Sequence, residues 1–107
     1  MSSEKPSWKK KLREEGYLEI PGFRIELTLD NTFLDLDYIP RIIVYDEETS
    51  HWYVLRNPIP KGKTLEENWD RAVGVLEKIV RGELKPNFEN EELSNRFLMT
   101  VRKFLDV

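Results

Sequence analysis

The sequence predicts an α+β fold in which a four-stranded antiparallel meander sheet is packed by two C-terminal amphipathic helices. Apolar residues alternate with polar ones from residue 23 onward, two prolines interrupt the chain near residue 59, and the apolar spacing then becomes helical. The 107 residues suit one hydrophobic core, so we expect a single domain over 1–107. Residues 1–7 are candidates for a disordered N-terminal tail.

The strands are predicted from alternation and from turn chemistry. The first covers about 23–30, and Asp30-Asn31 predicts a tight turn because both residues tolerate positive φ. Alternation resumes over about 32–38 until a proline stops it. The last two strands, about 41–46 and 51–56, are apolar on both faces, so we expect them to lie away from water on more than one side.

Capping residues and apolar spacing predict the helices. Thr64 and Glu67 form a Thr-x-x-Glu capping box ahead of a continuous apolar stripe, which is the strongest local signal in the chain. Ser7 and Asn90 are N-cap residues ahead of two further helical patterns, the first of which is short. These signals predict helices over about 8–15, 65–81 and 91–105.

The composition excludes several classes of site. The absence of cysteine removes disulfides, thiolate metal sites and cysteine nucleophiles, and the single histidine, His51, removes any multi-histidine site. We therefore expect no catalytic residues, no metal site and no cofactor, which favours a non-enzymatic protein. No apolar run exceeds the four residues Ile42–Tyr45, against about 20 for a membrane span. Together with the lack of a secretory signal, this predicts a cytoplasmic protein without membrane contact.

The N-terminal segment concentrates positive charge. Residues 1–13 carry a net charge of +4, so that the rest of the chain carries −7. An aromatic ring beside a basic cluster is a recipe for phosphate contacts. This favours, as an alternative, a nucleic-acid-associated regulator that binds through Trp8, Lys9, Lys10, Lys11 and Arg13. The competing interpretation is a solvated helix face.

Three aromatic residues lie in the doubly apolar strands: Tyr45, Trp52 and Tyr53. Two C-terminal helices cover only one face of a sheet well, so aromatic residues on the other face favour a protein partner or self-association through the sheet. The short N-terminal helix could instead fold across that face. Our first hypothesis is a small regulatory module that acts through protein–protein contact.

A carboxylate pair supports a third interpretation. Asp35 and Asp37 project from one face of a predicted strand, and Asp30 and Asp46 could join them at adjacent strand ends. Such oxygen ligands suit a hard divalent cation, so a small-ligand or metal-binding pocket stays open. The solvent-facing half of an alternating strand explains the same residues.

Part of the chain shows a family likeness. A hairpin, a proline-containing turn and a Gly-x-Thr helix start follow one another in Arg41–Arg56, Pro58, Pro60, Gly62, Thr64, Leu65, Glu66, Glu67, Ala72 and Leu76. Residues 41–80 thereby resemble the partly degraded ribonuclease-like domain of HicB-type antitoxins. That family has a further strand before the Gly-x-Thr element, where only Lys61 lies here, and often continues into a DNA-binding motif.

Overall fold

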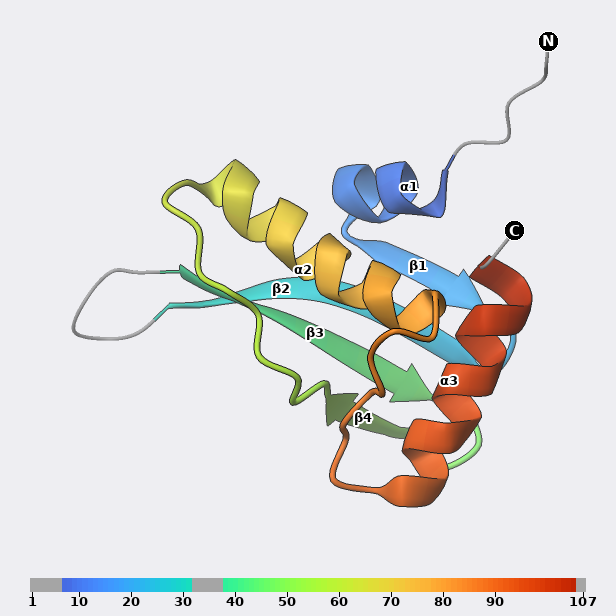
Figure 1. Cartoon of the computed structure of the whole chain (residues 1–107). Helices are drawn as coiled ribbons and strands as arrows, with labels where there is room; N and C mark the ends of the chain where they lie inside the picture. The colour runs from blue at the N-terminus through green and yellow to red at the C-terminus, as the bar shows by residue number, and fades with distance from the viewer. Residues whose placement is uncertain (1–6, 32–37, 106–107) are drawn as a thin grey trace, which may run out of the picture.

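The computed structural model describes residues 7–31 and 38–105, which form an antiparallel sheet and three helices (Figure 1). The four strands lie side by side in chain order, as a meander. The predicted α+β fold class is confirmed. The elements are α1 (Trp8–Glu15), β1 (Tyr17–Ile20), β2 (Phe23–Asn31), β3 (Tyr38–Asp46), β4 (His51–Val54), α2 (Leu65–Val80) and α3 (Glu91–Leu105).

The first strand of the sheet, β1, is one that the alternation from residue 23 does not predict. It pairs with β2 through a two-residue connection, Pro21-Gly22. Gly22 has a φ of 91°, which a type II turn requires and which proline at the preceding position favours. Leu18 and Ile20 are buried, so this short strand contributes to the core.

The long hairpin β2–β3 forms the centre of the sheet and corrects one predicted turn. The two strands pair over nine residues, and the pairing continues through Asn31 opposite Tyr38. Asp30 and Asn31 therefore belong to β2, and the turn predicted there is wrong. Residues 32–37, which make up most of the strand predicted at 32–38, lie outside the described residues.

Pro40 lies inside β3, opposite Leu29 of β2. Alternate residues of β3 direct their backbone groups to β2 and to β4, and Pro40 belongs to the set that faces β4. Because β4 ends at Val54, short of the predicted 51–56, it has no residue beside Pro40. The missing N–H of the proline therefore costs the ladder no hydrogen bond.

The helices match their predicted ranges to within one residue, and local hydrogen bonds explain why. The Thr64 hydroxyl accepts from the N–H of Glu67, at 3.1 Å, and the Glu67 carboxylate accepts from the N–H of Lys63, at 3.0 Å. Ser7 and Asn90 cap α1 and α3 as predicted. Ser7 apart, the predicted tail 1–7 lies outside the described residues. Among the described helices, none is long and apolar enough to cross a membrane.

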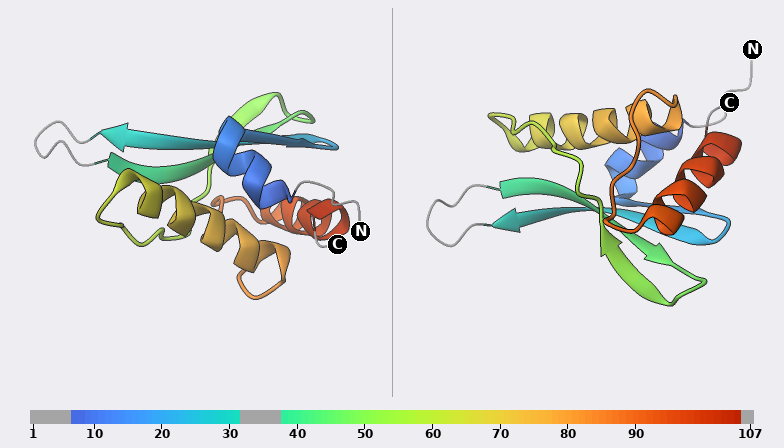
Figure 2. Two further views of the ribbon diagram at one scale, coloured as in Figure 1. Left: turned by 90° about the horizontal axis from the view of Figure 1, so that it is seen from above. Right: turned by 60° about the horizontal axis from the view of Figure 1, so that its bottom comes forward.

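All three helices pack on the same face of the sheet (Figure 2). Phe97 of α3 is fully buried at the centre of the core, where its ring packs edge-on against Phe23 and Phe88, with ring centroids 5.4 and 5.2 Å apart. Leu12 anchors α1 in the same core. The N-terminal helix thus reinforces the helical layer, and no described helix covers the opposite face.

We predict that Phe97→Ala lowers the free energy of unfolding by about 3–5 kcal/mol, because it opens a cavity beside the rings of Phe23 and Phe88. Phe104→Ala on the same helix is the matched control: its side chain is 42% exposed, so the loss should stay below about 1 kcal/mol. Urea unfolding followed by circular dichroism measures both. Equal losses for the two variants would contradict the assignment of the core.

Candidate functional site

The uncovered face of the sheet is defined by the alternation of side chains along each strand. Because Phe23, Ile25 and Leu27 point into the core, their neighbours in β2 point away from the helices. The strand register carries this alternation across the sheet, since directly paired residues share a face. Among the residues whose side chains the structure describes, the following lie on the uncovered face: Tyr17, Glu19, Arg24, Glu26, Thr28, Arg41, Ile43, Tyr45, Trp52 and Val54.

Apart from Arg41, the described side chains of β3 and β4 on this face belong to four residues without charge, which we call the aromatic patch: Ile43, Tyr45, Trp52 and Val54. Tyr45 and Trp52 are directly paired, with ring centroids 5.1 Å apart. Trp52 is 49% exposed, whereas the other three are half-buried. A tryptophan this exposed keeps a large apolar area in water unless another surface covers it.

The β1–β2 half of the same face is polar and internally paired. Nε of Arg24 donates to Glu26 at 2.7 Å, and its guanidinium lies 3.8 Å from Glu19 and 4.1 Å from the centre of the Tyr17 ring. The hydrogen bond to Glu26 raises the pKa of Arg24 above its ordinary value. Among the side chains that the structure describes on this face, Arg24 and Arg41 balance Glu19 and Glu26 in formal charge.

The structure separates Tyr53 from the other two predicted aromatic residues. Tyr53 points towards the helices and packs against the core, and its hydroxyl lies 3.3 Å from the Thr49 hydroxyl. His51 is exposed at the same side, with Nδ1 2.6 Å from the Thr49 carbonyl oxygen. Trp52 and Tyr45 therefore form one surface, and Tyr53 does not contribute its ring to it.

Helix α1 directs some residues of the predicted basic segment towards α2 and the core, and others towards the solvent. Nζ of Lys9 lies 2.7 Å from a Glu77 oxygen, and the Arg13 guanidinium donates to two carboxylates of α2, Glu66 and Asp70. The ring of Trp8 packs against the core. Only Lys10 and Lys11 of the predicted nucleic-acid-binding cluster are exposed. The others hold α1 against α2.

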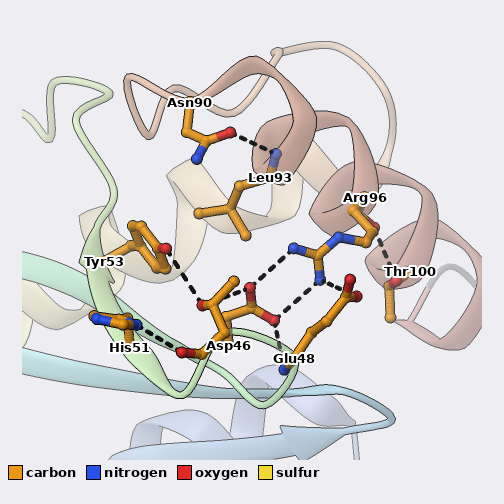
Figure 3. A network of polar contacts seen from close by, with 9 residues as sticks. Asp46, Glu48, His51, Tyr53, Asn90, Leu93, Arg96 and Thr100 are labelled. Atoms are coloured by element: carbon orange, nitrogen blue, oxygen red, sulfur yellow. Dashed lines mark hydrogen bonds and ion pairs between the residues drawn. The ribbon is translucent and has the colours of Figure 1, made fainter.

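An ion pair that no local pattern predicts, between buried Asp46 and partly exposed Arg96, holds the β3–β4 turn against α3 (Figure 3). Asp46, at the end of β3, is fully buried. Its carboxylate accepts from Nη1 and Nη2 of Arg96, at 3.0 and 2.9 Å, and from the Glu48 N–H and the Thr49 hydroxyl, at 3.1 and 3.0 Å. The hydrogen bonds from Arg96 lower the pKa of Asp46 to about 2.

The network fixes the position of β4 and so of Trp52. Asp46 and His51 close the hairpin, and Ser50 between them has a φ of 59°. A turn with such a residue needs external support, which the bidentate contact with Arg96 supplies. The oxygens of Asp46 are thereby occupied, so it cannot join the predicted cation ligands Asp35 and Asp37, which lie outside the described residues.

The ligand-pocket hypothesis receives little support from the hollow beside α1, because its charged side chains already pair with one another. This hollow of about 320 Å³ lies between α1 and the end of α2, and among its charged side chains Glu77 pairs with both Lys9 and Arg81. Among the described residues, no three histidine, aspartate or glutamate side chains lie close enough to hold a metal ion.

Comparison with models of protein families, with curated proteins and with solved structures finds no match. The resemblance of residues 41–80 to HicB-type antitoxins stays a prediction.

We predict that Asp46→Asn lowers the free energy of unfolding by roughly 2 kcal/mol at pH 7, because the folded pKa of about 2 lies below the unfolded value near 3.8. A carboxyl group whose pKa is lower in the folded than in the unfolded protein stabilises the fold at pH values above the unfolded pKa. This stabilisation is lost as the pH falls through the folded pKa. The difference between native and variant proteins should therefore shrink between pH 4 and pH 2 in urea unfolding experiments.

Glu48→Gln is the matched control, since Glu48 contacts the same guanidinium at 3.3 Å but is 66% exposed. It should change the free energy of unfolding by less than about 0.5 kcal/mol. If Asp46→Asn were as harmless as this control at pH 7, the pair would not be the support of the turn.

Proposed function

We propose that the chain is a non-catalytic protein-binding module of the cytoplasm that contacts its partner through the aromatic patch. The observation that carries the proposal is Trp52, half exposed and in tilted ring contact with Tyr45 on the face that no described helix covers (Figure 2). Tryptophan and tyrosine are enriched at interface centres because they bury a large area with few rotatable bonds. The flat apolar half and its paired polar half resemble the centre and the rim of an interface.

The chemistry around the patch supports binding over catalysis. The patch itself offers no general base or activated nucleophile, and His51 lies on the other face of β4. Among the groups that the structure describes, Asp46 has the most strongly shifted pKa, and its hydrogen-bond partners Arg96, Glu48 and Thr49 hold the β3–β4 turn in place. The hydrogen bonds that lower the pKa of Asp46 are those that stabilise the turn, so the shift indicates a structural role and not a catalytic one.

Nucleic-acid binding receives less support from the same geometry. Phosphate recognition needs several unpaired cations on one surface. Lys9 and Arg13 are paired with carboxylates of α2, and Arg24 on the uncovered face is paired with Glu26. Lys10 and Lys11 alone are a small footprint beside that of the aromatic patch.

Site-specific photo-cross-linking tests the proposal in cells of the organism that encodes the chain. We predict that the variant Trp52→p-benzoylphenylalanine forms discrete adducts with protein, because the photoreactive ring takes the place of a ring in contact with a partner. The same probe at Met99, which is 73% exposed on α3, should give adducts at least tenfold weaker.

Adding Val54→Lys to the probe-bearing chain should abolish the adducts, since it places a charge within the patch without touching the core. Equal labelling from positions 52 and 99, or adducts indifferent to Val54→Lys, would reject the aromatic patch as the contact surface.

A further inference from the structure

The outer edge of β4 has unpaired backbone groups at two residues. The N–H of Leu55 donates to the carbonyl oxygen of Ile42, at 2.9 Å, which places residues 51, 53 and 55 in the hydrogen-bonded set that faces β3. Trp52 and Val54 therefore direct their N–H and C=O groups away from the sheet. No described residue pairs with these groups, and β4 forms an outer border of the sheet (Figure 2).

Both ends of this edge are closed. Ser50 leaves the strand with a φ of 59°, so the extended backbone begins at His51. At the other end, the N–H of Arg56 donates to the carbonyl oxygen of Asn87, at 2.7 Å. The free edge is thus limited to the groups of Trp52 and Val54, and only a short strand fits it.

The opposite edge of the sheet differs in a way that matters for pairing. β1 carries Glu19, whose charge discourages another strand from adding to it. β4 consists of His51, Trp52, Tyr53 and Val54, none of which is a permanently charged residue. Exposed edges without charge are the ones that accept a further strand.

We propose that the occupant of this edge is a second copy of the same chain, paired antiparallel through β4. The inference rests on the proposed function and names its partner. Only one register uses every free group: Trp52 opposite Val54 of the second copy and the reverse, with the two Tyr53 residues facing each other across a two-fold axis. Shifting the axis to Trp52 would place Val54 opposite the Ser50 turn, and shifting it to Val54 would place Trp52 opposite the occupied Arg56.

This register also joins the two aromatic patches. Paired residues share a face, so Trp52 of each copy lies beside Val54 of the other on the uncovered side of a continuous eight-stranded sheet. The antiparallel arrangement brings the Glu47-Glu48 turn of one copy to the end of β4 where the other carries Arg56. Arg56 already contacts Glu89, at 3.2 Å, so this attraction adds specificity more than affinity.

The area buried between the two copies is small, and this limits the expected affinity of the dimer. Two strands of four residues and two tryptophans bury less than the roughly 1,200 Å² typical of tight complexes. We therefore expect a reversible dimer that forms with rising protein concentration.

Cysteine cross-linking tests the register, since the chain has no cysteine of its own. Directly opposed residues of a non-hydrogen-bonded pair lie about 4.5 Å apart at Cα, close enough for a disulfide. Tyr53→Cys should give a disulfide-linked dimer on mild oxidation with diamide. His51→Cys is the matched control on the same side of β4: in this register its thiol lies about 13 Å from its mate, so its yield should be at least tenfold lower.

His51 is the more exposed of the two residues, so random collision would favour the control. A higher yield from His51→Cys, or no dimer from a folded Tyr53→Cys protein, would overturn the proposed register. Thermal melts establish that each variant is folded.

A second pair of variants keeps the inference testable if Tyr53→Cys does not fold. Val54→Pro removes an outward N–H that has no partner in the described structure, so it should weaken association at least tenfold in sedimentation equilibrium. Val54→Thr keeps the N–H and the shape, and should associate nearly as the native chain does. A native chain that stays monomeric, or equal effects of the two variants, would overturn edge pairing. Cross-links from position 52 to other proteins alone would preserve the proposed function and reject the second copy.

Discussion

A pleated strand places every second side chain on the far face of the sheet, and the helices that the structure describes cover the near face only. All three helices share one layer, in which Phe97 and Leu12 lie in the same core. On the far face, no described helix packs against the side chains of the strands. On the β1–β2 half, charged residues satisfy each other, whereas on the β3–β4 half a tyrosine and a tryptophan remain in contact with water. The functional interpretation follows from this unequal covering.

The ion pair of Asp46 and Arg96 connects the two faces. From the helical side it fixes the turn between β3 and β4, and so determines where Trp52 lies on the opposite side. Asp46 is fully buried, so its charge would be costly without the hydrogen bonds from Arg96, and the turn is stabilised in the arrangement that keeps the two together. Here the arrangement specified is that of the edge strand, which carries both the aromatic patch and the free backbone groups.

The helices could be predicted because their determinants are local: the capping box of Thr64 and Glu67 and the spacing of apolar residues lie within single segments. The strands could be predicted only in part. Pro21-Gly22 is a recognisable turn signal that would have revealed β1. The turn expected at Asp30-Asn31 was wrong because pairing with β3, a non-local interaction, extends β2 through both residues.

In the candidate site, too, some features follow from local sequence and others depend on contacts between distant segments. Alternation along β4 alone separates Trp52 from Tyr53, so their opposite faces follow from the sequence once the strand is known. That α1 joins the other helices, and that Lys9 and Arg13 meet carboxylates of α2, depends on packing between distant segments. The same is true of Asp46 and Arg96, which lie 50 residues apart in the chain.

Residue-resolved amide hydrogen exchange, measured by NMR at a low and a high protein concentration, tests the central claim most directly. In dilute solution, the amides of Trp52 and Val54 should exchange much faster than those of Tyr53 and Leu55, because only the latter two donate within the sheet. At high concentration the first two should become protected as well. Strong protection of Trp52 and Val54 in dilute solution, where the chain is alone, would show that the chain covers this edge itself and would contradict the account.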